Sequence, residues 1–379
     1  MTASSLFSEE HEAFRRTVRE FFARELEPFI SDWEPEGRLP DEVWLKAGEL
    51  GLLCPSIPEE YGGVGGDFLF NVVVAEEIGY AIGGGSITFS GHSDIVAFYI
   101  LNHASEGLKR RWLPKMVSGE ASSAIVMSEP GAGSDLKAIR TRADRQGDEY
   151  VINGAKTFIT NGLDADILVV ACKTDPEAGA KGVSLLLVEA DREGFRRGKT
   201  LHKIGQKASG TCELFFDDVR VPAENLLGQE GKGFAIMMEE LPRERINIAV
   251  RAFTSAQRGF ELTADYVKER TAFGKQVIEF QTCSHALADI KADLTVGRAY
   301  LDQCLRRIVS GELSSAEAAV AKLWMAEMEW RTLDRCLQLH GGYGYMLEYP
   351  ISRLFLDARS RRIYGGTSEI MRDVIARGV

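Results

Sequence analysis

The chain has 379 residues, 45% of them hydrophobic, which is enough to bury a large core in two or three packed units. Its 56 acidic residues outnumber its 45 lysines and arginines, so the formal net charge is −11. This balance disfavours a general nucleic-acid binder but still permits a local basic pocket for an anionic ligand.

The N-terminal residues MTASSLFSEEHEAFRR lack the basic start and apolar core of a signal peptide. No apolar run approaches the roughly 20 residues that cross a bilayer. The six cysteines have no close pair, and the six histidines show no metal-binding spacing. We therefore expect a cytoplasmic protein without a metal site, a disulfide or a stable membrane insertion.

Helical periodicity dominates the first third of the chain. Ser8 is a plausible N-cap for a helix whose apolar stripe includes Val18, Phe21 and Phe22. Further helical patterns cover residues 41–50, 67–78 and 105–117, separated by turns rich in Gly and Pro. Residues 1–121 are predicted to form an N-terminal all-α domain.

The pattern then changes to short β-forming runs bounded by Gly, Asp or Asn. They cover residues 150–152, 167–171, 183–188 and 212–216. No helical pattern lies between them, so we expect an antiparallel, barrel-like β domain over residues 122–231 rather than a βαβ array.

From residue 232 to residue 379 the helical period returns. A long helix is expected through residues 285–308 and another through 314–339, and their short connections predict a four-helix bundle. The predicted fold class is α+β, with a β domain between two helical domains.

The first candidate binding motif is Ser-Glu-Pro-Gly-Ala-Gly-Ser-Asp, residues 128–135. Its small residues would let backbone amides approach a flat or anionic ligand closely. On its own, the GAGS part is more often an ordinary turn.

The second motif, NGAKTFITNG at residues 153–162, has Asn-Gly at both ends. By pattern alone it predicts a β-hairpin.

The third motif, ERTAFGK at residues 269–275, is followed by Gln281. The Arg270 guanidinium can hold a pyrophosphate through paired hydrogen bonds, and Phe273 offers an aromatic surface. The alternative is a charged helix end with Gly274 as its cap.

With QLHGG at residues 338–342 and RIYGGTSEIMR at residues 362–372, these strings resemble the acyl-CoA dehydrogenase family, most closely its long-chain branch. The resemblance covers nearly the whole chain. It implies an FAD cofactor, an acyl-CoA substrate, electron-transferring flavoprotein as acceptor, and a homotetramer built as a pair of dimers. In relatives, the elements around Arg270 and Gln338 act across a subunit interface.

The resemblance also assigns residues. The Phe158 position, usually tryptophan in the family, is expected to pack on the flavin. The FAD-binding residues are expected to be Met127, Ser128, Gly133, Ser134, Phe158, Ile159, Thr160, Arg270, Phe273, Gln281, Gln338, Gly341, Gly342, Thr367 and Glu369. The substrate-binding residues are expected to be Ser134, Arg245, Tyr364 and Gly365.

In many family members the residue after the Tyr364 position is the glutamate that removes the substrate's α-proton, whereas here it is Gly365. By composition alone, ELPRERI at residues 240–246 begins a charged helix, and Glu244 would be a solvated side chain. In the isovaleryl and long-chain branches, however, a glutamate directly before a helix arginine supplies the base. Glu244 is therefore predicted to be the catalytic base, and Gly365 to contribute its backbone N–H.

The implied reaction is FAD-dependent dehydrogenation of a saturated, medium- or long-chain acyl-CoA to the trans-2-enoyl-CoA, with hydride transfer to flavin N5. Four alternatives stay open: a short or branched substrate, a carrier-protein-bound substrate, an acyl-CoA oxidase, and an inactive scaffold that binds acyl-CoA.

Overall fold

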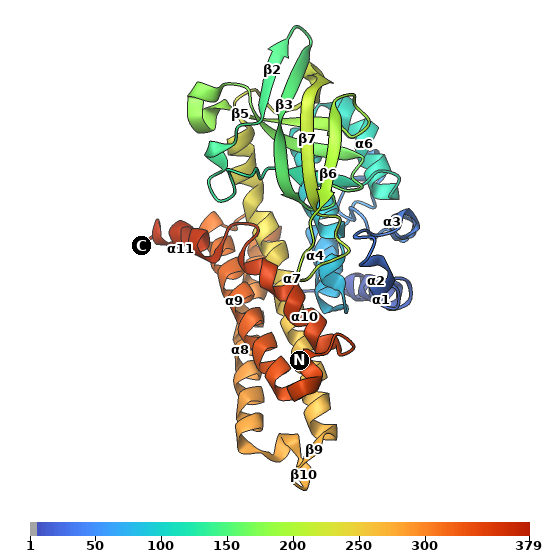
Figure 1. Ribbon diagram of the computed structural model, residues 1–379, viewed down its shortest axis with the longest axis vertical. Helices are drawn as coiled ribbons and strands as arrows, with labels where there is room; N and C mark the ends of the chain where they lie inside the picture. The colour runs from blue at the N-terminus through green and yellow to red at the C-terminus, as the bar shows by residue number, and fades with distance from the viewer. Residues whose placement is uncertain (1–5) are drawn as a thin grey trace.

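Helix α7 (Gly233–Glu269) runs along the length of the molecule and connects its β-rich end to its helical end (Figure 1). The computed structural model describes residues 6–379. Within that range no helix combines the length and the apolar character that a membrane crossing requires.

Six α-helices and a π-helical turn make up the N-terminal part. Ser8 caps the first of them, and its hydroxyl accepts from the His11 N–H. The helices predicted at residues 41–50, 67–78 and 105–117 are confirmed, whereas α5 and the π-helical turn Gly91–Val96 before it had no clear sequence signal. The helices are α1 (Glu9–Glu25), α2 (Ile30–Trp33), α3 (Asp41–Glu49), α4 (Phe68–Tyr80), α5 (Ala97–His103) and α6 (Glu106–Ser118).

Eight strands form one sheet in the order β6-β7-β3-β2-β4-β5-β8, with β1 beside β4. All four predicted strands are present. Most pairs are antiparallel, as expected, but β1 runs parallel to β4, and one parallel bridge joins β2 to β4. The strands are β1 (Ser123–Val126), β2 (Arg142–Gln146), β3 (Glu149–Ile159), β4 (Ile167–Lys173), β5 (Val183–Glu189), β6 (Phe195–Thr200), β7 (Cys212–Pro222) and β8 (Leu226–Leu227).

The hairpin predicted at residues 153–162 is wrong. Strand β3 continues through Asn153 and Gly154, and it pairs with β7 on both sides of a bulge. A Cβ atom on Gly154 would lie 2.4 Å from the Thr141 hydroxyl oxygen, so this glycine serves a close approach of two strands. The chain turns only after Ile159. Pairing along β7 therefore outweighs the local preference of Asn-Gly for a turn.

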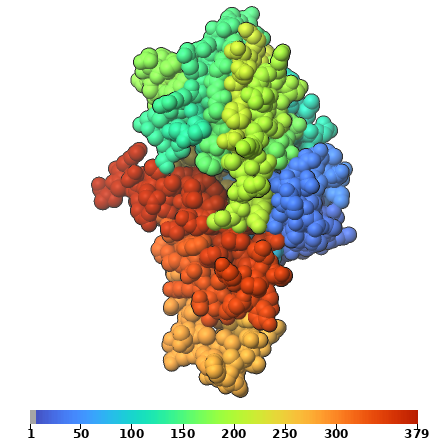
Figure 2. Space-filling view, in the orientation of Figure 1, coloured from blue at the N-terminus to red at the C-terminus, as the bar shows by residue number. Residues whose placement is uncertain are grey.

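The C-terminal part is the predicted helical bundle. The long helices α7, α8 (Gln281–Val309) and α9 (Ser315–His340) pack with the shorter α10 (Pro350–Ala358) around a buried apolar core. A small hairpin of β9 (Thr271–Ala272) and β10 (Lys275–Gln276) joins α7 to α8, and α11 (Ser368–Ala376) ends the chain. The segment after α9, drawn in red, crosses the middle of the molecule between the strands and the tip of the bundle (Figure 2).

One buried ion pair fixes this crossing segment to α9. Arg361, which lies shortly before Tyr364, is 1% exposed and contacts the carboxylate of Glu329, which is 0% exposed. A buried ion pair contributes little beyond an apolar pair of similar size, but losing one partner leaves the other charge buried and uncompensated.

We expect Arg361→Met to lower the free energy of unfolding by about 3–5 kcal/mol, because it strands the Glu329 carboxylate in the core. The thermal unfolding midpoint should fall accordingly. The double variant Arg361→Met/Glu329→Leu removes both charges and should recover part of the loss. A double variant less stable than the single one would contradict this account.

Candidate active site

Glu244 lies inside α7 rather than at a helix start, and its side chain is buried, with 7% of the residue exposed. The Tyr99 hydroxyl donates to its Oε1 at 3.1 Å. The pKa of Glu244 is raised to about 7, chiefly by burial and also by nearby Glu240, while the Tyr99 hydrogen bond and two arginines act against the rise. The expectation of a solvated glutamate, based on composition alone, is wrong. At neutral pH this carboxyl group can both hold and release a proton.

Gly365 and Gly366 have φ angles of +66° and +91°, in the region that favours glycine. A Cβ atom on Gly365 would lie 2.3 Å from Cδ1 of Ile248. Ile248 follows Glu244 by four residues, so the two share one face of α7. The fold thus brings the predicted base and the glycine at the usual base position to the same stretch of α7.

Two buried cations, Lys322 and Arg245, accompany the Gly365–Gly366 turn. Lys322 of α9 is 0% exposed and donates to the Gly366 carbonyl at 2.5 Å. The pKa of Lys322 is lowered to about 8, chiefly by burial and also by Arg245. Arg245 is buried and donates to the Ser315 hydroxyl at 3.2 Å, and its Nε has no hydrogen-bond partner within residues 6–379. The motifs did not identify Lys322; its only signal is a lysine on the buried face of an Ala-rich helix.

Lys156 of β3 holds the base of the 128–135 loop. Its buried ammonium donates to Oε1 of Glu129 at 2.9 Å and to the Met127 carbonyl at 3.0 Å. The Thr157 N–H donates to the Ser128 carbonyl at 3.0 Å, which joins the second motif to the first. The two motifs therefore form one surface.

The outer part of that loop is open. No atom lies within 4 Å of a Cβ placed on Gly131 or Gly133, and Ser134 is exposed. Met127 and Ser128 are half-buried at its root. The loop therefore leaves room for a ligand above its backbone.

Phe158 is 70% exposed and has φ +58°, which is rare for a bulky residue and typical of a constrained functional site. Thr160 is exposed as well, whereas Ile159 between them is 2% exposed and points into the sheet. An aromatic ring and a hydroxyl thus lie beside the open loop. For Ile159 only the backbone can take part in the expected ligand contact.

Comparison with known proteins identifies the family. Family models described as the N-terminal, middle and C-terminal domains of acyl-CoA dehydrogenase match residues 8–120, 124–219 and 231–379. The chain belongs to the acyl-CoA dehydrogenase family. It is an FAD-dependent oxidoreductase that acts on CH–CH bonds.

The long-chain specific acyl-CoA dehydrogenase, mitochondrial, of Rattus norvegicus is 48% identical over 376 residues, which cover 99% of this chain and 87% of the relative. The crystal structure of an acyl-CoA dehydrogenase from Geobacillus kaustophilus has a TM-score of 0.97 at 48% identity, covering 100% of this chain and 99% of that one. A glutaryl-CoA dehydrogenase from Mycobacterium smegmatis, solved in complex with FADH2, has a TM-score of 0.92 at 29% identity, covering 100% and 96%.

The surface formed by the first two motifs fits the flavin of FAD. A flat conjugated ring can stack on the exposed Phe158. The open glycine loop can bring backbone amides close to the same ligand, and the hydroxyls of Ser134 and Thr160 can hydrogen-bond to it. Within residues 6–379, no three His, Cys, Asp or Glu side chains gather into a group that could hold a metal.

Six of the remaining predicted FAD residues form a distal group at the C-terminal end of α7. Helix α7 ends at Glu269, so the alternative in which Gly274 caps a charged helix end is wrong: Gly274 turns the β9–β10 hairpin. Phe273 at the tip of this hairpin is 96% exposed. The other members, all exposed, lie directly after α7, at the start of α8 or around the end of α9: Arg270, Gln281, Gln338, Gly341 and Gly342.

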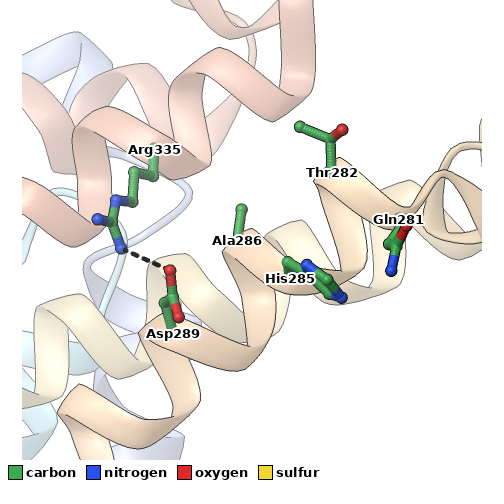
Figure 3. A pocket seen from close by; sticks show the side chains of 6 residues that line it. All are labelled: Gln281, Thr282, His285, Ala286, Asp289 and Arg335. Carbon is green, nitrogen blue, oxygen red and sulfur yellow. Dashed lines mark ion pairs between the residues drawn. The ribbon is translucent and has the colours of Figure 1, made fainter.

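A shallow hollow of about 480 Å³ adjoins this distal group (Figure 3). It is lined by Gln281, His285 and Asp289 on one face of α8, and Arg335 of α9 lies 3.9 Å from the Asp289 carboxylate. The hollow continues the surface that carries Gln281.

The distal group lies at the C-terminal end of α7, which has 37 residues. At 1.5 Å per residue the helix spans about 55 Å. The β9–β10 hairpin accordingly lies at the opposite end of the molecule from the sheet (Figure 1). In a single chain, Phe158 and Phe273 do not contribute to the same binding site.

Thr367 and Glu369 lie at the start of α11. The Thr367 hydroxyl caps this helix by accepting from the Ile370 N–H at 3.3 Å. Glu369 is exposed and lies 3.9 Å from Arg372. Both remain available at the surface next to the Gly365–Gly366 turn.

Gly365→Ala should lower the thermal midpoint, because the new methyl group meets Cδ1 of Ile248 and because a left-handed φ costs a non-glycine residue about 1–2 kcal/mol. Adding Ile248→Val removes that Cδ1 atom and should restore part of the loss. Gly107→Ala, where a Cβ meets nothing within 4 Å, is the matched control and should not destabilise. Equal midpoints for wild type and Gly365→Ala would show that the turn tolerates side chains.

Proposed function

We propose that this acyl-CoA dehydrogenase converts a saturated, medium- or long-chain acyl-CoA to the trans-2-enoyl-CoA, with Glu244 as the base that removes the α-proton. The observation that carries the proposal is the buried Glu244 carboxyl group on the α7 face that meets Gly365. Bound FAD supplies the acceptor for the β-hydride, and electron-transferring flavoprotein then takes up the two electrons.

The environment of Glu244 suits this role. The α-proton of a thioester is a very weak acid, so a base with an ordinary carboxylate pKa would be poorly matched to it. Burial has already raised the pKa of Glu244 to about 7. The ionised form takes the pro-R α-proton and becomes a neutral carboxylic acid, which is the form that a buried site favours.

The Gly365–Gly366 turn supplies the second requirement, a donor for the charge that develops on the thioester oxygen. The backbone N–H of Gly365 is that donor, and it survives the loss of the side chain. Lys322, through the Gly366 carbonyl, holds the turn in place. The Nε of Arg245 is buried and has no hydrogen-bond partner within residues 6–379, so we assign the polar arm of the substrate to this side chain.

Phe158 lies on the sheet, whereas the β9–β10 hairpin of the distal group lies at the opposite end of the molecule (Figure 1), and this separation supports a second copy of the chain. The distal group of one subunit then completes the FAD site that begins at Phe158 of the other. A pair of such dimers would form the expected homotetramer.

The long-chain specificity named for the rat relative supports the chain length that we propose. The same motifs would serve a short, branched or carrier-bound acyl group. An oxidase would differ from the proposed enzyme in its reaction with oxygen, and an inactive scaffold would differ in its binding of FAD. The cytoplasmic location remains a prediction, while the rat relative is mitochondrial by name.

Glu244→Gln should retain yellow flavin and bind acyl-CoA but lose at least ~1,000-fold in turnover, because the amide cannot accept the α-proton. Glu239→Gln, an exposed neighbour on the same helix, is the control and should keep its activity. Turnover near the wild-type rate in Glu244→Gln would exclude it as the base.

An anaerobic titration of the purified enzyme with saturated acyl-CoAs of increasing length tests the reaction and the substrate together. Long chains should bleach the visible flavin band, and short chains should have little effect. Bleaching by short or branched thioesters alone would keep the mechanism and reject the chain length. A flavin that no acyl-CoA bleaches would indicate a carrier-bound substrate. Rapid peroxide formation in air would indicate an oxidase. A colourless protein that does not bind added FAD would indicate an inactive scaffold.

A further inference from the structure

A polar seam, buried at Tyr99 and open at Asn102, joins one face of α5 to the face of α7 that carries Glu244. The Tyr99 hydroxyl donates to Glu244 at 3.1 Å. One turn further along α5, the Asn102 amide donates to Oε1 of Glu240 at 2.8 Å, and Nε2 of His103 lies 3.0 Å from the same oxygen. Asn102 and His103 follow Tyr99 by one turn of α5, and Glu244 follows Glu240 by one turn of α7. The contacting side chains therefore have the same spacing on both helices.

Glu240 is as deeply buried as the base, with 4% of the residue exposed. Arg243 donates to its Oε2 at 2.5 Å, and the Arg243 guanidinium lies 3.8 Å from the ring centre of Phe98 on α5. Glu240 is therefore held in place from both helices. Its distance from Glu244 is one helical turn, close enough for two buried carboxyl groups to repel each other appreciably.

The contacts before α5 keep this seam in register. Asp94, in the π-helical turn, accepts from the Asn71 amide at 2.6 Å and from the Asn247 amide at 2.5 Å. Asn71 belongs to α4 and Asn247 to α7, so the turn is tied to both helices. A π-helical turn inside a helix often marks a functional site, and here it leads directly into the residues that reach Glu240 and Glu244.

We propose that Tyr99 and Glu240 tune the catalytic base in opposite directions: the phenol stabilises the ionised Glu244 by donating to it, and the Glu240 carboxylate stabilises the protonated form by repulsion. The inference rests on the proposed role of Glu244. Tyr99 and Glu240 are thus positioning residues that set the pH range of the base.

Each group around Glu244 shifts its pKa in the direction that the proposal requires. After burial, the hydrogen bond from Tyr99 lowers the pKa of Glu244, and Glu240 raises it. Arg245 and Arg243 lower it. His103 faces Glu240 from α5, and Lys322 of α9 lies behind Arg245. Because Arg243 is paired with Glu240, removing the Glu240 charge also leaves that arginine free to attract the Glu244 carboxylate.

The pH dependence of kcat/KM in the FAD-loaded enzyme tests the inference. In the wild type the value should rise with pH through about 7, as Glu244 becomes ionised. Tyr99→Phe removes the donor, so the acidic limb should move up by about 1 pH unit. Glu240→Gln removes the repulsion, so the limb should move down. General damage to the fold does not predict opposite shifts.

Tyr61→Phe is the matched control, because it removes a phenol that donates to another carboxylate, Glu106, at 2.9 Å. Its acidic limb should coincide with that of the wild type. Thermal midpoints and flavin absorbance verify that each variant is folded and loaded. Tyr99→Phe keeps the ring, so its packing should persist.

An infrared titration of the protonated-carboxyl band supplies a readout that does not depend on turnover. The band of Glu244 is identified by its loss in Glu244→Gln, and its midpoint should shift as the kinetic limb does in both variants. Midpoints that stay at the wild-type value, or that move in the same direction, would overturn the inference. Should Glu244→Gln remain active, the proposed base itself would fail, which is a separate result.

Discussion

The site depends on keeping the carboxyl group of Glu244 buried while it remains able to take up a proton. A buried carboxylate without partners would be too costly, and one with a full ion pair would be too weak a base. The structure uses a partial solution, in which one phenol donates to Glu244 and no cation among residues 6–379 forms an ion pair with it. The arginines that flank it in sequence make their contacts with Ser315 and Glu240.

The glycine turn is the complement of this arrangement. With no side chain at Gly365, the turn comes so close to Ile248 that a Cβ atom would collide with it. A side chain on the turn would therefore collide with α7 at Ile248, one helical turn from Glu244. Lys322 holds the turn from α9 by its bond to the Gly366 carbonyl, so three separate segments of the chain meet at one point.

The length of α7 has a second consequence. The same helix carries Glu244 near the sheet and ends directly before Arg270, so one continuous element reaches both of the surfaces that we propose to bind FAD. The exposed aromatic side chains of Phe158 and Phe273 mark these two surfaces. In an assembly, α7 would transmit the geometry of the base to the subunit contact without a flexible joint.

The sequence by itself determined the order of helical, β and helical regions. The 3.6-residue periodicity and the short β-forming runs are local patterns, because they depend only on which side chains of one segment face the core. Its motifs, by resemblance, also identified the family, FAD and the candidate base. It did not determine the path of β3, since pairing with β7 overrode the two Asn-Gly signals. Only the tertiary structure decided that Tyr99 donates to the base and that Lys322 holds the glycine turn. These contacts join residues 44 to 145 positions apart, whose separate local patterns contain no information about which side chains meet.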